Sequence, residues 1–196
     1  RQESLCTPHI YDLNEYIGTG IHEMTICVSN VGYKTKGGHL TSPDTQTNWN
    51  GITGRIELIG YKNAHAENVM LWCDIHNKTV RVTADITGGK SGKAVISAES
   101  FNSEKNHTPA VQSFEYTNGK LDALYKMGDD CLLWSEHEPN LYKLRIDIDG
   151  DVSEHIIGMR EFKTESGKFT VNGEKTFLRG KHDGMIFPKT AFAPTD

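Results

Sequence analysis

Residues 142–150 read YKLRIDIDG and decide the class of fold that this sequence predicts. Tyr142, Leu144, Ile146 and Ile148 are apolar and alternate with charged residues up to an Asp-Gly pair. A period of two places successive side chains on opposite faces of a strand, and Asp-Gly favours the positive φ angles of a tight hairpin. The stretch therefore predicts an antiparallel strand with one buried face, followed by a hairpin turn.

The same pattern recurs on both sides of this stretch. Strands are predicted at 24–28, 55–59, 68–74, 79–87, 93–101, 111–116 and 154–162. Gly and Asn pairs that favour turns separate them: Gly37-Gly38, Gly88-Gly89, Asn118-Gly119 and Asn172-Gly173. No long segment combines the 3.6-residue period of a helix with capping residues at both ends. Many short strands with regular turns predict an all-β sandwich or barrel.

Composition excludes several classes of protein. The chain has 196 residues, of which 36% are hydrophobic and 24% charged, which is enough apolar material for a core and argues against disorder. It contains no apolar run near the roughly 18 residues of a membrane span. The net charge of -5 does not attract the negatively charged phosphate backbone of a nucleic acid, so nucleic acid is not a predicted partner.

The four cysteines, Cys6, Cys27, Cys73 and Cys131, lie far apart and form no C-x-x-C pair. Neither a zinc site nor a redox dithiol is therefore predicted, and no metal or cofactor is expected. Cys27 and Cys73 stand in alternating apolar runs, where we expect buried, isolated thiols. A disulfide remains an open alternative.

Two polar segments are candidate ligand-binding loops. Residues 179–184 read RGKHDG after an apolar strand, and a strand-end loop of this kind often carries binding residues, here His182 and Asp183. Residues 46–52 read QTNWNGI, in which the ring of Trp49 can stack on a sugar while Asn50 bonds to its hydroxyls. The alternatives are a solvated turn for the first segment and a packed Trp with turn-forming Asn residues for the second.

Several motifs in sequence order resemble glycoside hydrolase family 2, which includes β-galactosidases, β-glucuronidases and β-mannosidases. Residues 11–30 and NWNGITGRIEL at 48–58 are similar to the end of the family's sugar-binding jelly roll. The central residues are similar to the signature of its immunoglobulin-like domain: LWS at 133–135, EPNLYKL at 138–144 and GMREF at 158–162. FTVNGEK at 169–175 and FLRG at 177–180 resemble the entry into its (β/α)8 barrel.

The resemblance implies an all-β chain in three parts. Residues 1–61 would be the C-terminal part of a jelly-roll sugar-binding domain, and residues 62–166 a complete immunoglobulin-like β-sandwich. Residues 167–196 would be the entry hairpin and truncated start of the catalytic barrel. The chain would then be an excised piece of a longer enzyme. Within the sandwich, Trp134 would help to form a corner, Tyr142 would face the core, and Arg160 would reach across the domain boundary.

The family resemblance also implies a function. The family hydrolyses β-glycosidic bonds with retention, using two Glu carboxylates about 5 to 5.5 Å apart. In the family both lie beyond the point where this sequence stops, so no Glu is assigned here and the chain alone is expected to be inactive. The substrate would be an oligo- or polysaccharide of the β-galactoside kind. A periplasmic or secreted location is expected only by analogy with other members of the family.

The loop after LRG lines the sugar subsite in the family, which implies substrate contact for His182 and Asp183, and secondarily for Trp49 and Asn50. Lys181 and Asp183 depart from the usual Asn-x-His pattern of β-galactosidases, which leaves the sugar open. The alternative function is a non-catalytic glycan-binding or adhesion module built from β-sandwiches, with the Trp49 loop as its contact surface.

Overall fold

The structure is a computed structural model that describes residues 2–4, 7–29, 51–52 and 54–180. The chain divides into two compact units, one from Ile59 to Lys181 and one that gathers Arg1–Leu58 and His182–Asp196. The described residues of the second unit contain no strand, so the strands predicted at 24–28 and 55–59 are wrong there. Alternation makes a segment suitable for a sheet, but a strand also needs a neighbour to pair its backbone groups.

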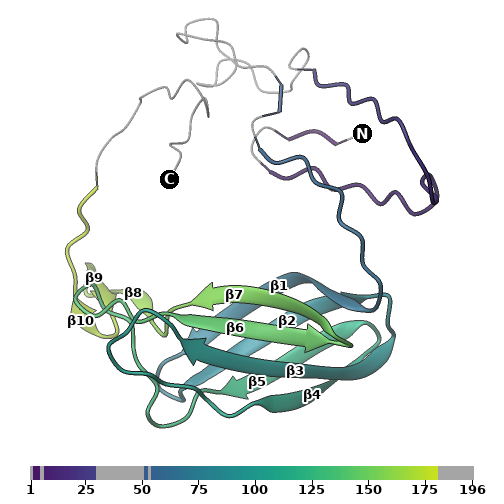
Figure 1. Cartoon of the computed structure of the whole chain (residues 1–196). Coiled ribbons are helices and arrows are strands. Elements are labelled where there is room, and N and C mark those ends of the chain that lie inside the picture. Colours follow the sequence, from purple (N-terminus) through teal and green to yellow (C-terminus); the bar gives the residue numbers. More distant parts are fainter. Residues whose placement is uncertain (1, 5–6, 30–50, 53, 181–196) are drawn as a thin grey trace, which may run out of the picture. The chain divides into compact units, whose positions relative to one another are not determined.

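Seven antiparallel strands form a sandwich in the Ile59–Lys181 unit. They are β1 (His65–Asp74), β2 (Thr79–Thr87), β3 (Ser91–Ser100), β4 (Gln112–Thr117), β5 (Lys120–Lys126), β6 (Tyr142–Ile148) and β7 (Asp151–Ile157). Their order is β1-β2-β5-β4-β3-β6-β7, but β4 pairs with β5 only at the hairpin end, Thr117 with Lys120. The strands therefore form two layers, β1-β2-β5 and β4-β3-β6-β7 (Figure 1), in an immunoglobulin-like arrangement.

The core lies between these two layers and follows the predicted alternation. In β6, Tyr142, Leu144, Ile146 and Ile148 are fully buried, and the intervening residues are not. Alternate positions of the neighbouring strand β3 and of β2 and β5 in the other layer add to the core: Val80, Val82, Ala84, Ile86, Ala94, Ile96, Ala98, Leu121, Ala123 and Tyr125. The all-β fold expected from the sequence is confirmed for the described residues.

Tight two-residue turns connect successive strands. Asn118-Gly119 joins β4 to β5 and Asp149-Gly150 joins β6 to β7, with both residues of each pair at positive φ. Two positive φ angles define the turn whose twist matches that of antiparallel strands. These two predicted turns are confirmed.

A second, smaller sheet follows the sandwich. It contains β8 (Phe162–Glu165), β9 (Lys168–Val171) and β10 (Glu174–Lys175), in the order β10-β9-β8. The single strand predicted at 154–162 is wrong, because β7 ends at Ile157 and Phe162 starts β8. The Asn172-Gly173 hairpin is present, but its second arm is Glu174–Lys175 and not 176–179, since a two-residue turn pairs Val171 directly with Glu174. The predicted boundary between residues 166 and 167 falls inside the turn from β8 to β9, and the three predicted domain limits stay predictions.

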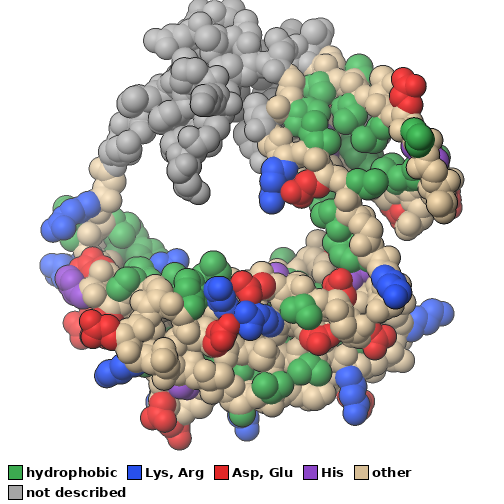
Figure 2. Space-filling view, in the orientation of Figure 1, with side chains coloured by type: hydrophobic (Ala, Val, Ile, Leu, Met, Phe, Trp, Pro, Cys, Tyr) green, Lys and Arg blue, Asp and Glu red, His purple; other side chains and the backbone are tan. Residues whose placement is uncertain are grey.

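Paired charges cover the outer face of the β3-β6-β7 layer. Arg145 lies 2.9 Å from a carboxylate oxygen of Glu99 and 3.0 Å from one of Glu154. Figure 2 shows this mixture of acidic and basic side chains on the sandwich, and hydrophobic side chains gathered over the β8-β9-β10 sheet. The described residues contain no helix with the length and hydropathy to span a membrane.

The described cysteines are unpaired and differ in burial. Cys131 is buried, whereas Cys73, which was expected to be buried, is only half-buried. Cys27 is exposed, so its predicted burial is wrong. Cys27 lies in a segment without a strand partner, and an alternating sequence buries a side chain only where another layer covers it.

Candidate functional site

All four residues predicted to bind substrate lie outside the described residues. These are Trp49, Asn50, His182 and Asp183, so their role stays a prediction. The chain that leads to His182 can be followed to Gly180, where Arg179 and Gly180 are exposed and belong to no strand. The candidate site described below is therefore the part of the sandwich from which this segment departs.

Trp134 occupies a corner of the sandwich and is enclosed by residues of its own unit. Its backbone N–H donates to Met159 O at 3.0 Å, and it pairs with Pro139 across the corner. A Cβ on Gly158 would lie only 3.2 Å from the Trp134 ring. The Arg160 guanidinium lies 4.9 Å from the ring centroid, in cation–π contact. The corner and the buried Tyr142 are thus as expected, whereas Arg160 stacks on Trp134 of its own unit.

Asn172 ties the small sheet to this corner. Its Nδ2 donates to Trp134 O at 2.9 Å, and its Oδ1 accepts from Glu161 N–H at 2.8 Å. Its backbone N–H also donates to Glu161 O at 2.9 Å. We call Trp134, Glu161 and Asn172 the junction. Because backbone groups are fixed in direction, these three bonds orient the β9-β10 hairpin relative to the sandwich.

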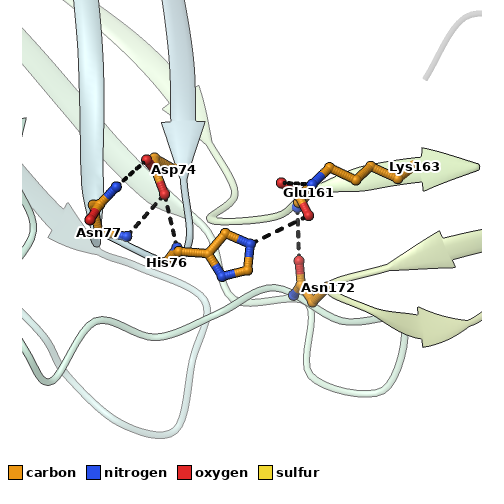
Figure 3. Close-up of polar contacts among 6 residues, drawn as sticks. All are labelled: Asp74, His76, Asn77, Glu161, Lys163 and Asn172. Atoms are coloured by element: carbon orange, nitrogen blue, oxygen red, sulfur yellow. Dashed lines mark hydrogen bonds and ion pairs between the residues drawn. The ribbon is translucent and has the colours of Figure 1, made fainter. Parts of the chain in front are cut away.

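The Glu161 side chain links the junction to the β1-β2 turn (Figure 3). It lies 2.8 Å from Lys163 Nζ and 3.6 Å from His76 Nε2. The turn that carries His76 is held by Asp74, whose Oδ1 accepts from the N–H groups of His76 and Asn77, both at 2.9 Å. The hydrogen bond from Lys163 lowers the pKa of Glu161, and the charges of Lys163 and His76 act in the same direction. Glu161 is therefore an anion that binds its neighbours and is unsuited to donate a proton as a general acid.

A shallow polar hollow lies by the β3-β4 and β5-β6 connections. Its lining is Lys105, Asn106, His107, Thr108, Asp130 and Leu132. The Tyr142 hydroxyl lies 2.7 Å from His107 Nδ1 and accepts from Leu132 N–H at 2.8 Å. Burial lowers the pKa of His107, against the opposing charge of Asp130. The imidazole is thus held in place by the core and favours its neutral form.

The described residues offer little for catalysis or metal binding. No group of three or more His, Cys, Asp or Glu side chains is placed to hold a metal ion within the described ranges. Burial raises the pKa of the Cys73 thiol to about 11, which keeps it protonated and unreactive at neutral pH. The chemistry visible here is that of packing and orientation.

Sequence reasoning missed the junction. The sequence marks Asn172 only as a turn residue that tolerates positive φ, and its φ is indeed 53°. Nothing in a turn motif reveals that its side chain reaches Trp134, which is 38 residues earlier in the chain. The one available signal was the resemblance to the family. Its motifs LWS, GMREF and VNG contain Trp134, Glu161 and Asn172, the three residues of the junction.

Comparison with protein families gives a match over the sandwich. Residues 64–160 match the family described as Glycosyl hydrolases family 2. This range begins next to β1 and ends at Arg160, so it contains the seven strands and the Trp134 corner.

Curated relatives match most of the chain. The β-galactosidase of Leuconostoc mesenteroides is 22% identical over 94% of this chain and 19% of its own length. That of Thermoanaerobacter pseudethanolicus is 26% identical over 97% of this chain and 27% of its own length. That of Kluyveromyces lactis is 24% identical over 88% of this chain and 20% of its own length. The chain thus spans only about a fifth to a quarter of these relatives.

Solved structures include bacterial β-glucuronidases. That of Parabacteroides merdae superposes with a TM-score of 0.44 at 20% identity, covering 62% of this chain and 17% of that chain. Bacteroides uniformis β-glucuronidase 3 gives a TM-score of 0.42 at 26% identity, and the match covers 63% of this chain and 16% of that chain. The family match covers the sandwich, just under half of the chain, and the curated relatives agree with it, so residues 64–160 are similar to glycosyl hydrolases family 2.

Proposed function

We propose that this chain is a non-catalytic part of a retaining β-glycosidase that acts on β-galactosides. The observation that carries the proposal is the family match over residues 64–160. The relatives' name, β-galactosidase, supports the sugar, because the alignments to the Leuconostoc and Thermoanaerobacter proteins extend over 94% and 97% of this chain. Most of the length of those proteins has no counterpart here, so the activity would belong to a longer protein.

The hydrolysis would use two carboxylates supplied by other residues of that protein. One would attack the anomeric carbon and the other would protonate the leaving oxygen, then deprotonate the water that releases the sugar. The Glu161 carboxylate is already paired with Lys163 and His76, which supports a structural role for it. None of the described Glu residues is assigned to catalysis in this proposal.

The part played by this chain would be to support and shape the edge of the active site. The sandwich would supply a rigid body, and the junction would fix the hairpin from which residues 176–180 continue. His182 and Asp183 would bind hydroxyl groups of the substrate, with Trp49 and Asn50 as a second contact. Loops held by rigid strands suit this task because the strands fix where a binding side chain stands.

The test compares this chain with the same chain extended by the sequence that follows it in its own gene. We expect no hydrolysis of p-nitrophenyl β-galactoside, β-glucuronide or β-mannoside by the chain alone. The extended protein should hydrolyse the β-galactoside, and NMR should find the β-anomer as the first product. His182→Ala in the extended protein should raise KM more than it lowers kcat.

Two results would contradict the proposal. Turnover by the chain alone that His182→Ala abolishes would make this chain catalytic. An extended protein that binds oligosaccharides without hydrolysing any of the three glycosides would favour the glycan-binding alternative. A heat-denatured sample and an Asn118→Gly variant, altered in the β4-β5 turn, serve as controls.

A further inference from the structure

The polar hollow by the β3-β4 and β5-β6 connections has two walls that are held by the core. On one wall, Ser100 at the end of β3 accepts from His107 N–H through its Oγ at 2.8 Å, and its own N–H donates to His107 O at 2.9 Å. On the other wall, Leu132 N–H donates to the Tyr142 hydroxyl at 2.8 Å. The same hydroxyl lies 2.7 Å from His107 Nδ1, and the Tyr142 ring is fully buried. Because one core side chain joins both walls, the hollow is formed before a ligand arrives, which lowers the entropic cost of binding.

Four polar side chains of the hollow are available to a ligand. They belong to Lys105, Asn106, Thr108 and Asp130, which are all exposed, and the structure shows no hydrogen bond or ion pair of these side chains within the described part of the chain. Lys105 only donates hydrogen bonds and the Asp130 carboxylate only accepts them, whereas the other two side chains can do both. A hydroxyl group also donates and accepts, so neighbouring hydroxyl groups of one ligand can bond to this mixture of side chains.

The charges that line the hollow favour a neutral ligand. Lys105 stands on the β3-β4 connection and Asp130 on the β5-β6 connection. Burial lowers the pKa of His107, so its imidazole adds no positive charge near neutral pH. An anion would be attracted by Lys105 and repelled by Asp130, and a cation the reverse, so a charged ligand gains little from the pair. Hydroxyl groups can bond to both side chains at once, and hydrogen bonds to charged partners are the stronger ones.

We propose that this hollow binds a neutral saccharide, whose hydroxyl groups bond to Lys105 and Asp130 while the carbon face of the ring lies against Leu132. The hollow has a volume of about 600 Å³, within the roughly 300 to 1,000 Å³ of small-molecule sites. A sugar ring suits the lining because donors and acceptors stand on both connections and an apolar side chain lies among them. The inference goes beyond the proposed function and uses none of the residues assigned to substrate there. Because the hollow is shallow, we expect a dissociation constant in the millimolar range.

Three sugars with the same ring and different charges test the class of ligand. D-galactose is neutral, D-galacturonic acid is an anion and D-galactosamine is mostly a cation at about pH 6.5. Each is titrated into the nitrogen-15-labelled chain and followed by NMR at the backbone amides of residues 105–108 and 130–132. Galactose should shift these amides saturably, and neither charged sugar should bind more tightly. Glycerol, which has hydroxyl groups but no ring, should bind at least about 5-fold more weakly because it makes fewer contacts.

Two charge variants show whether the hollow itself recognises the sugar. Asp130→Asn and Lys105→Gln each replace a charged partner by a neutral amide, so each should raise the Kd for galactose about 5-fold. Asp130→Asn should also turn the preference toward galacturonic acid, and Lys105→Gln toward galactosamine, a reversal that a merely structural role would not produce. Glu115→Gln is the matched control, because it removes one charge from an exposed side chain of β4 on the side of the β4-β5 hairpin. It should leave the Kd unchanged.

The pattern of amide shifts decides the outcome. Saturable shifts at the hollow that both variants weaken and Glu115→Gln does not would support the inference, and the same spectra show that each variant is folded. It would be overturned if galactose well above millimolar concentration gave no saturable shift, or if glycerol bound as tightly as galactose. A parent chain that prefers either charged sugar by about 5-fold, or variants that bind galactose as tightly as the parent, would overturn it as well. None of these results depends on hydrolysis, so this inference and the proposed function can fail separately.

Discussion

Tyr142 offers a sharp test of how the sandwich is stabilised. Its ring is fully buried, and its hydroxyl lies between His107 Nδ1 at 2.7 Å and Leu132 N–H at 2.8 Å. Tyr142→Phe removes only the oxygen and keeps the ring in the core. The substitution leaves Leu132 N–H without its acceptor and His107 Nδ1 without its hydrogen-bond partner, both in partly buried positions.

The cost can be worked from these two bonds. A hydrogen bond contributes about 0.5 to 1.5 kcal/mol net, and a buried group left without a partner costs about 1 to 3 kcal/mol. We therefore expect Tyr142→Phe to lower the free energy of unfolding by about 2 to 3 kcal/mol. For a domain of this size, that corresponds to a fall in Tm of about 10 °C.

Two other buried tyrosines provide matched controls for the same chemical change. The Tyr125 hydroxyl donates to Ala110 O at 3.1 Å and also bonds to the backbone of Ala98, but the bond to Ala110 O is longer than either bond of the Tyr142 hydroxyl, so Tyr125→Phe should cost less, about 1 kcal/mol. For the Tyr116 hydroxyl the described residues provide no hydrogen-bond partner, and Tyr116→Phe should stay within about 0.5 kcal/mol of the parent. The measurement is urea unfolding followed by tryptophan fluorescence. Equal losses in all three variants would refute the reasoning, because they would show that hydroxyl bonding does not set the cost.

Two further predictions concern packing and pH. Gly158→Ala should destabilise the unit by about 1 to 2 kcal/mol, because the new Cβ would press on Trp134 at 3.2 Å; Gly60→Ala, with open space around it, should not. An unchanged urea midpoint for Gly158→Ala would show that the ring can move aside. Stability should also fall as pH rises from about 9 to 12: burial raises the pKa of Cys73 to about 11 and that of Tyr125 to about 12, so the folded state holds protons that the unfolded state has released. Melting temperatures at increasing pH test this, and a Tm that stays level up to pH 12 would contradict it.

The sequence predicted those parts of the fold that depend on local chemistry. Alternation placed β2 at 79–87 with the bounds that the structure has, and identified the buried face of β6. The strand β5, at Lys120–Lys126, was not among the predicted strands although it alternates as clearly. Residues 24–28 alternate as well and form no strand. Alternation therefore shows that a segment can enter a sheet, but it does not show which other strand would pair with it.

For the candidate site, the sequence supplied the participants but not the bonds between them. The family-like motifs contained Trp134, Gly158, Arg160 and Asn172, all of which meet near one corner. Arg160 was expected to reach across a boundary and instead lies over the Trp134 ring. The four residues predicted to bind sugar lie outside the described residues, so that prediction awaits the KM measurements.

What the sequence determined by itself is the all-β class, the buried faces of β2 and β6, and the turns at Asn118-Gly119 and Asp149-Gly150, because a period of two and a positive φ are properties of neighbouring residues. What only the tertiary structure decided is where β7 stops, which layer each strand joins, and that Asn172 bonds to a backbone 38 residues away. Such contacts depend on how distant strands pair and pack, and a local pattern carries no information about which distant group will lie within about 3 Å of a side chain.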